Sequence, residues 1–233
     1  MIPKPNKDKT LVSNYRPISL LNNYIKLYAK IIANRLLPLL PRIISLDQTG
    51  FTPGREAKDN TIKAIHVQHW LIKSKSPGFF LSLDAEKAFD RIAWDYMLDV
   101  LKSLGIQDRM LGFINLLYSY PTARIKVNGV LSEAFSLSNG TRQGCPLSPI
   151  IFILILEPFL CRLRENVDIS GVKIISTAYK LAAFADDILL FLTNPIITIP
   201  NLLKDFSMFR TISNFKINFS KSKALNISFP LTR

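Results

Sequence analysis

The sequence predicts a mixed α+β fold in which strands arrive as hairpins between helices. Stretches with apolar residues at helical spacing, such as 20–37, alternate with shorter apolar runs that favour strands, such as 79–84. Two pairs of strand-like segments flank turns, one at 128–129 and one at 186–187, and these predict hairpins. Helix and strand signals mixed along one chain are typical of the α+β class.

The charge composition favours a nucleic-acid partner. The chain of 233 residues contains 30 Lys and Arg against 17 Asp and Glu, which gives a formal net charge of +13. This excess is spread along the chain, and a distributed positive charge favours a polyanion, nucleic acid first and an anionic membrane second. A solvated basic surface is the alternative explanation of the charge alone. With 48% hydrophobic residues, the chain is long enough for a real core.

Nothing in the sequence points to secretion or to a membrane span. The N-terminus has no apolar segment of the kind that a signal peptide needs. Cys145 and Cys161 cannot build a disulfide framework. The longest apolar run, 149–160, is short and contains Glu157 and Pro158, so it predicts a buried helix. We therefore expect an intracellular protein without a membrane partner.

The first part of the chain predicts an extended segment followed by a helix. Residues 2–19 are basic and interrupted by prolines, so we expect them to be extended or looped. The stretch 20–37 has helical periodicity, with Asn22 or Asn23 as its cap and Pro38 as its stop.

A second helix is expected after the turn-rich stretch 47–60. Asp59 or Asn60 is the expected cap. The apolar face of this helix is predicted to consist of Ile62, Ile65, His66 and Trp70.

The remaining helices follow the same reasoning. Two helices, 94–105 and 107–119, are separated at Gly105. A loop at 139–149 leads into the apolar helix, and a late helix at 199–212 lies among short strands.

Three carboxylates stand where apolar strands end. Asp84 closes the run 79–84, while Asp186 and Asp187 interrupt the apolar run "FADDILLFL". If the two elements are neighbours in one sheet, the three carboxylates cluster at one end, where they repel unless divalent cations neutralise them. Oxygen ligands suit Mg²⁺, and two such ions ~4 Å apart can activate an attacking hydroxyl and stabilise a leaving pyrophosphate. On the residues alone, such a doublet is more often an ordinary turn, and spacing does not show that Asp84 and Asp186 meet.

Six stretches carry a resemblance to a known family. Three of them, "FLSLDAEKAFDRIAW", "SNGTRQGCPLSPIIFILILEPF" and "FADDILLF", stand in a characteristic order and spacing. The others are "IPKPNKDKTLVSNYRPISLLN", "DQTGFTPGREAKDN" and "KINFSKSKALNIS". Together they cover nearly the whole chain and resemble the reverse transcriptases of LINE-type, non-LTR retrotransposons.

The resemblance implies a right-hand polymerase made of fingers and palm. We expect one truncated reverse transcriptase domain, with fingers at 1–78 and a palm at 79–233 whose antiparallel sheet packs on helices. The family's proteins are longer, with an endonuclease before the polymerase and a thumb and a Cys-rich tail after it. The chain thus resembles fingers and palm without a thumb, from a larger protein or from the surviving reading frame of a decayed element.

The implied activity is RNA-directed DNA synthesis. Nucleotidyl transfer from a dNTP to a primer 3′-OH would use two Mg²⁺ ions, with Mn²⁺ as a possible substitute. The implied partners are an RNA template, a DNA primer and dNTPs, and the implied location is the nucleus and cytoplasm. An RNA-dependent RNA polymerase is disfavoured by the "FADD" doublet and by Phe89. The alternative from a different class is a non-catalytic, nucleic-acid-binding remnant of a truncated retroelement.

The resemblance assigns metal ligands and cationic residues. Asp84 and Asp186 match the family's metal-binding aspartates, Asp187 matches the second member of the doublet, and the Ala85 carbonyl would be a further ligand. Lys221 matches a lysine that could protonate or steady the leaving pyrophosphate.

The resemblance also assigns substrate-binding residues in the fingers and around the palm. Phe89 matches the bulky residue beneath the sugar, which excludes a 2′-hydroxyl sterically; a core role at the start of a helix is compatible with this. The motif of Arg142, Gln143 and Gly144 would meet the nucleotide and the template.

Two cationic positions in the fingers complete the implied set. Lys4 and Arg16 match residues that reach the triphosphate, and Arg16 is the better candidate because its guanidinium suits phosphate oxygens.

Overall fold

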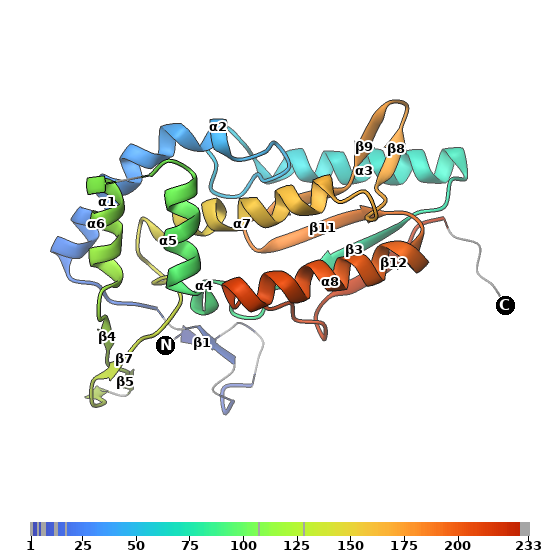
Figure 1. Cartoon of the computed structure of the whole chain (residues 1–233). Helices are drawn as coiled ribbons and strands as arrows, with labels where there is room; N and C mark the ends of the chain where they lie inside the picture. The colour runs from blue at the N-terminus through green and yellow to red at the C-terminus, as the bar shows by residue number, and fades with distance from the viewer. Residues whose placement is uncertain are drawn as a thin grey trace.

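A four-stranded antiparallel sheet forms the centre of the molecule (Figure 1). Its strand order is β10-β11-β3-β12, and each neighbouring pair is antiparallel. The strands span Leu181–Phe184 (β10), Asp187–Leu192 (β11), Phe79–Leu83 (β3) and Lys223–Asn226 (β12). The computed structural model describes residues 2–3, 5, 8–11, 14–16, 18–106, 108–127 and 129–228. The predicted α+β class is confirmed, and so is the pairing of the strands that carry the carboxylates.

Helices cover both faces of this sheet. One face meets α5 (Trp94–Ser103), α7 (Ser148–Glu165) and α8 (Pro195–Ser213), and the other meets α3 (Ala57–Ser74). The first face carries Phe79, Leu83, Leu181, Ala183, Ile188 and Leu190. The second face carries Phe80, Ala182 and Phe191, which pack with Val67 and Leu71 of α3. Because helices cover both faces at β3, β10 and β11, these three strands are nearly continuous apolar runs, whereas β12 is exposed.

Helix α7 is buried almost all round, as its sequence predicts. Every residue from Ile150 to Leu156 is buried, and Pro158 lies inside the helix. A helix that is apolar on all sides belongs in a core when it is too short to span a bilayer. Among the described residues, no helix has the length and apolar content of a membrane span.

The first helix confirms its predicted cap and corrects its predicted end. Helix α1 (Asn23–Leu36) begins after Asn22, whose side-chain oxygen accepts a hydrogen bond from the Tyr24 amide at 3.0 Å. Pro38 does not stop the chain, which continues as a 3-10 helix, η2 (Leu37–Leu39), and then as α2 (Leu40–Ile43). Pro38 lies in the first turn of η2, where a missing N–H costs little.

Helix α3 corrects two predictions. It begins at Ala57 with Glu56 as the N-cap, three or four residues before the expected cap, and Asp59 instead accepts a hydrogen bond from the Glu56 amide at 3.0 Å. The expected apolar face is also wrong, since Ile62 and Ile65 are exposed and His66 is exposed as well. Its fourth member, Trp70, is partly buried, while Val67 and Leu71 are the buried positions. The sheet covers the face centred on those two residues, and helical periodicity alone cannot identify which face is covered.

The other helices agree closely with their predictions. Helix α5 and helix α6 (Asp108–Tyr118) occupy the two predicted stretches on either side of Gly105, and α4 (Ala88–Arg91) precedes them. Helix α8 begins at Pro195, earlier than predicted. Proline is favoured in a first helical turn, so Pro195 begins the helix readily.

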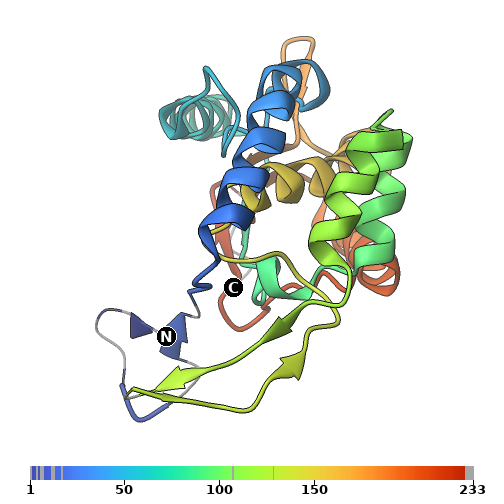
Figure 2. The same ribbon diagram turned by 90° about the vertical axis from the view of Figure 1, so that its left-hand side faces the viewer.

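Short strands form an arm outside the core. The predicted hairpin is present, with Gly129 at φ 86° in its turn, although Asn128 lies outside the described residues. Figure 2 shows this arm extending away from the helices. Its strands are β4 (Thr122–Ala123), β5 (Lys126–Val127), β6 (Val130–Leu131) and β7 (Phe135–Ser136).

Two further strand pairs are separate from this arm. They are β1 (Ile2–Pro3) with β2 (Tyr15–Arg16), and β8 (Val172–Ile174) with β9 (Thr177–Tyr179).

A buried ion-pair network joins α7 to the segment before α3. Glu157 is 3% exposed, and its Oε1 accepts from Arg164 Nη1 at 2.9 Å and from the Ser45 amide at 3.1 Å. Arg164 Nε also donates to Asp47 Oδ2 at 3.1 Å, and Lys63 Nζ of α3 lies 2.6 Å from Asp47 Oδ1. Since each charge has an opposite partner, the network fixes residues 45–47 between two helices.

We expect Glu157→Gln to lower the free energy of unfolding by about 3 kcal/mol, because it leaves the Arg164 guanidinium without its main buried counter-charge. Urea unfolding followed by circular dichroism measures this loss. The control is Lys58→Gln, which breaks an exposed ion pair with Glu56 and should cost less than about 0.5 kcal/mol. Equal losses in the two variants would contradict a structural role for the buried network.

Candidate active site

The register of two central strands brings carboxylates from distant parts of the chain together. Leu83 of β3 pairs with Ile188 of β11. Continued by one residue, this antiparallel register places Asp84 opposite Asp187. Asp186 immediately precedes that position in the β10–β11 turn. The three aspartates that the sequence singled out therefore lie together at one end of these two strands.

The turn lies one residue earlier than the sequence predicts. Phe184 pairs with Asp187, so the two turn residues are Ala185 and Asp186. Asp187 is the first residue of β11. Ala185 has φ 55°, a left-handed conformation that is uncommon for a residue other than glycine, Asn or Asp.

Burial and mutual repulsion disfavour the negative charge of the doublet. Burial is the main cause that raises the pKa of Asp186, and the charges of Asp187 and Asp84 raise it further. Burial likewise raises the pKa of Asp187, with the charge of Asp84 as the second cause. The cluster is therefore short of positive charge.

Asp84 is held by backbone contacts and has one cation near its carboxylate. Its amide donates to Ser222 Oγ at 3.3 Å, and its carbonyl accepts from the Asn218 amide at 2.7 Å. Lys221 Nζ lies 3.5 Å from Asp84 Oδ2. That oxygen is buried and has no hydrogen-bond partner among the described residues. Ala85, the next residue, is buried and bridges to Ile217.

The donor chemistry of this cluster fits a divalent cation. Three carboxylates, one of them with a buried oxygen that accepts no hydrogen bond among the described residues, are the hard ligands that Mg²⁺ prefers. As the described side chains lie, no three His, Cys, Asp or Glu residues converge in a metal-binding geometry. The structure thus supplies the ligand types and their shared location, but not a closed coordination shell.

The segment after Asp84 carries a second charged group. Glu86 forms ion pairs with Lys216 at 2.7 Å and with Arg91 at 2.5 Å. Hydrogen bonds from Lys216 and Arg91 lower the pKa of Glu86. Because its charge is already balanced, Glu86 serves to attach this segment to residues 216–218 rather than to bind an ion.

The loop before α7 is fixed through Gln143. Its carbonyl accepts from the Ser19 amide at 3.0 Å, and its side-chain Nε2 donates to Asp90 Oδ1 at 3.0 Å. Gly144 has φ 98°, which requires a residue without a Cβ atom. Asp90, to which the sequence assigns no role, thereby positions this loop.

Arg142 and Phe89 are both engaged with the protein. The Arg142 guanidinium donates to the Leu117 carbonyl and lies 5.6 Å from the centre of the Tyr118 ring. The half-buried Phe89 ring stacks on Phe152, with ring centres 4.4 Å apart. Phe89 thus has the core role that the sequence left open for it.

The two fingers cations are placed only in part. Arg16 lies in β2, and nothing is described of its side chain. Lys4 lies outside the described residues.

An open cleft of about 650 Å³ lies between the loop before α7, the N-terminal segment and the β4–β7 arm. Its lining includes Ile18, Asp90, Trp94, Arg124, Arg142 and Gln143. Asp84, Asp186 and Asp187 are not among the described residues that line it. The cleft and the carboxylate cluster are thus separate features, linked through the segment from 84 to 90.

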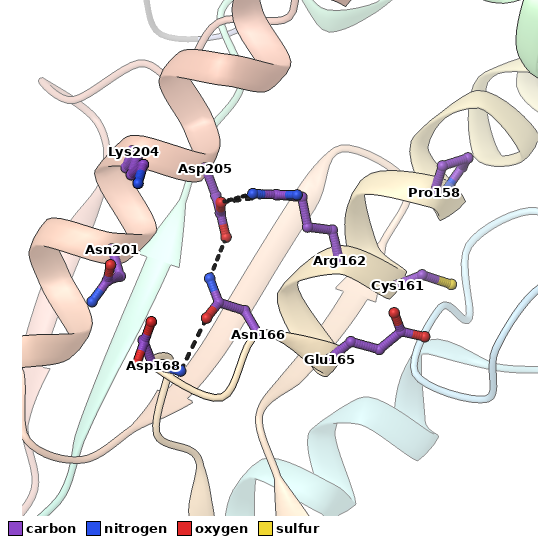
Figure 3. A pocket seen from close by; sticks show the side chains of 9 residues that line it. All are labelled: Pro158, Cys161, Arg162, Glu165, Asn166, Asp168, Asn201, Lys204 and Asp205. Carbon is purple, nitrogen blue, oxygen red and sulfur yellow. Dashed lines mark hydrogen bonds and ion pairs between the residues drawn. The ribbon is translucent and has the colours of Figure 1, made fainter.

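A second cavity, of about 500 Å³, lies between α7 and α8 (Figure 3). Asp205 is 1% exposed, and its two oxygens accept from Arg162 Nη2 at 2.8 Å and from Asn166 Nδ2 at 2.7 Å. Since both oxygens are satisfied, this group joins the two helices and leaves the carboxylate no free oxygen for a ligand.

Sequence reasoning missed one buried side chain that contacts the turn before Asp186. Gln48 is completely buried and bonds to the backbone of Ala185. A turn-rich stretch gives no local signal that one of its side chains will reach a distant hairpin.

Comparisons with known proteins agree on one family. The family model described as reverse transcriptase (RNA-dependent DNA polymerase) matches residues 2–230. The transposon TX1 uncharacterized 149 kDa protein of Xenopus laevis is 33% identical over 97% of this chain and 17% of its own length. A Pol polyprotein from the type-1 retrotransposable element R2 of Popillia japonica is 28% identical over 98% of this chain and 32% of its own length.

Solved structures show the same fold. Apo telomerase from Candida tropicalis superimposes with a TM-score of 0.62 over 88% of this chain and 38% of that chain, at 12% identity. The same enzyme in complex with a fragment of telomeric RNA gives a TM-score of 0.60 over 86% of this chain and 33% of that chain, also at 12% identity.

The chain spans 17% and 32% of the length of the two relatives described. The match over nearly the whole chain confirms the resemblance read from the sequence motifs. The chain belongs to the reverse transcriptase (RNA-dependent DNA polymerase) family, and its relatives are proteins of non-LTR retrotransposons.

Proposed function

We propose that this chain is the fingers-and-palm part of an RNA-directed DNA polymerase, which joins a dNTP to a primer 3′-OH on an RNA template. One observation carries the proposal: the pairing of β3 with β11 brings Asp84, Asp186 and Asp187 together at one end of these strands. The match to the reverse transcriptase family supports it, and the net charge of +13 suits a nucleic-acid partner.

The division into fingers at 1–78 and palm at 79–233 is part of this proposal. The strands of the central sheet all come from the second segment. Helix α3 comes from the first segment and packs on that sheet, so the two segments share a core. We assign no residue of this chain to a thumb.

Asp84, Asp186, Asp187 and the Ala85 carbonyl would hold two Mg²⁺ ions, or Mn²⁺ in their place. Bound there, the ions would favour ionisation of the primer hydroxyl and stabilise the charge of the leaving pyrophosphate. The shortage of positive charge around the doublet and the Asp84 oxygen that accepts no hydrogen bond among the described residues support this assignment. Lys221, which is exposed and lies close to Asp84, is suitably placed to steady or protonate the pyrophosphate.

The loop of Arg142, Gln143 and Gly144 would meet the nucleotide and the template. Gly144 lets its backbone approach a ligand closely, and the contacts of Arg142 and Gln143 hold the loop beside the open cleft. Phe89 would support the sugar while stacked on Phe152. Lys4 and Arg16 would reach the triphosphate.

A second candidate function is a non-catalytic, nucleic-acid-binding protein. It is favoured by the strong positive charge and by the lack of a converged metal-binding group among the described side chains. Binding alone would need none of the three aspartates, so substitution of the aspartates separates the two functions.

We expect Asp84→Asn or Asp186→Asn to abolish Mg²⁺-dependent extension of a DNA primer on an RNA template, by at least about 100-fold, while affinity for the duplex is retained. Asparagine preserves the shape of the side chain but removes the charge that holds the ions. Primer extension and fluorescence anisotropy measure the two properties. Asp99→Asn, on the exposed side of α5, is the matched control and should extend normally. Near-normal synthesis by either active-site variant would refute the assignment.

Without metal, Asp186→Asn should raise the melting temperature by about 2–4 °C, which corresponds to about 1 kcal/mol for a protein of this size. The pKa of Asp186 is raised by burial and by its acidic neighbours, so the folded state disfavours its charged form, and asparagine removes that cost. Thermal unfolding in EDTA measures the change, with Asp99→Asn as an inert reference. An unchanged or lower melting temperature would contradict the inference that the folded state disfavours the charged form of Asp186.

Phe89→Val should raise ribonucleotide incorporation relative to deoxynucleotide incorporation by about tenfold, because the smaller side chain makes room for a 2′-hydroxyl. Competition between rNTP and dNTP in primer extension measures the ratio. Phe152→Leu is the control, since it disrupts the same stacked pair from the buried side and should lower stability without changing the ratio. If both variants leave the ratio unchanged, Phe89 is only a core residue.

A further inference from the structure

The segment Asp47–Thr49 extends the central sheet beside the candidate active site. Strand β10 is an edge strand of the four-stranded order. Its Ala183 amide donates to the Asp47 carbonyl at 2.8 Å, and the Ala183 carbonyl accepts from the Thr49 amide at 2.9 Å. Gln48 thus forms a parallel bridge with Ala183. Residues far from the palm in sequence therefore lie alongside the strand that leads into the Ala185–Asp186 turn.

The side chain of Gln48 continues this pairing onto the turn itself. Its Oε1 accepts from the Ala185 amide at 2.9 Å, and its Nε2 donates to the Ala185 carbonyl at 3.1 Å. The amide side chain therefore satisfies both backbone groups of the residue before Asp186. Oε1 also accepts from the Gly50 amide at 2.9 Å, which orients the amide group.

The turn needs such a partner. Ala185 is buried, and its φ of 55° is a strained conformation for an alanine. A buried N–H and C=O without partners would favour rearrangement of the turn, since unsatisfied buried polar groups are costly. Gln48 is completely buried, so its hydrogen bonds do not compete with water.

Close packing by Gly50 holds the turn from the same side. A Cβ atom at residue 50 would collide with the Ala185 backbone nitrogen and lie 3.0 Å from the Phe184 carbonyl carbon. Glycine at this position therefore allows a contact between the two backbones that no other residue permits.

Gln48 is itself held in a rigid frame. Its backbone N–H donates to the Ser45 carbonyl at 3.1 Å. The Arg55 guanidinium donates to the carbonyls of Gln48 at 2.8 Å and Ile44 at 2.7 Å, and also to that of Ser45. The neighbouring Asp47 belongs to the buried ion-pair network of α7. The position of the turn is thus determined by the scaffold and not by the hairpin alone.

We propose that Gln48 is a positioning residue for the candidate active site: its side-chain amide holds the Ala185–Asp186 turn and so fixes where the Asp186 and Asp187 carboxylates stand. This inference rests on the proposed polymerase function for its catalytic consequence. Gln48 touches neither carboxylate and acts only through the backbone of the turn.

Gln48→Met tests this directly, because methionine fills a similar volume without a hydrogen-bonding amide. In the metal-free chain, the Ala185 amide should exchange with solvent at least about tenfold faster, whereas the amides of β3 keep their protection. In primer extension, the maximal rate should fall about 10- to 100-fold, while the dNTP concentration at half-maximal rate changes less than about twofold.

Two further variants keep the test decisive if Gln48→Met does not fold. In Gln48→Glu, burial favours the protonated carboxyl, which keeps an acceptor for the Ala185 amide and an O–H donor for the Ala185 carbonyl, so amide protection should persist with a smaller loss of rate. Gly50→Ala keeps the Gln48 amide but brings a Cβ atom against the Ala185 nitrogen and 3.1 Å from Gln48 Oε1, so it should disturb the same contact and reproduce the loss of maximal rate.

Asn60→Leu is the matched control. Asn60 Nδ2 donates to the Ala183 carbonyl at 2.8 Å and to Thr49 Oγ1 at 2.9 Å, so it supports the same segment without contacting the turn. This variant should lower the melting temperature and leave both the Ala185 exchange rate and the maximal extension rate unchanged.

Unchanged Ala185 exchange in Gln48→Met would overturn the proposal, and so would a rate loss equal to that of Asn60→Leu. If the unsubstituted chain extends no primer, the polymerase function fails for this chain. Amide exchange would still decide whether Gln48 holds the turn.

Discussion

The antiparallel pairing of β3 with β11 is the contact on which the rest of the structure depends. Both strands are apolar on both faces, and helices cover both faces, so a shift of register by one residue would exchange the side chains of the two core layers. The register that satisfies both layers is also the one that places Asp84 opposite Asp187. Core packing thus determines the separation of two carboxylates that are far apart in the sequence.

Gathering these carboxylates opposes folding, and the surrounding structure compensates. Burial and repulsion raise the pKa values of Asp186 and Asp187, and Ala185 adopts a strained backbone conformation beside them. The buried network of Glu157, Arg164 and Asp47 anchors the segment that contacts this turn. Local strain and unfavourable charge at one end of the strands, supported by an ion-paired frame, are typical of sites that act on ligands.

Both core layers contain helices that precede β3 in sequence. One layer joins the sheet to α5, α7 and α8, which follow β3, and includes Ile32 and Leu36 of α1, while the other joins the sheet to α3. Because α3 and the segment Asp47–Thr49 both pack on the sheet, the first part of the chain supports the sheet at the strand ends where the carboxylates lie.

Local patterns in the sequence determined most of the elements and the positions of the candidate site residues. The cap at Asn22, the apolar helix α7, the hairpin at 128–129 and the carboxylates at strand ends were all predictable, because each depends on neighbours within a few residues. The motifs likewise sufficed to identify the family. Only the tertiary structure decided the strand order, the buried face of α3, the passage of the chain through Pro38 and the contact of Gln48 with Ala185. These features depend on which surfaces meet across long stretches of chain, and periodicity records that a face is apolar without recording what covers it.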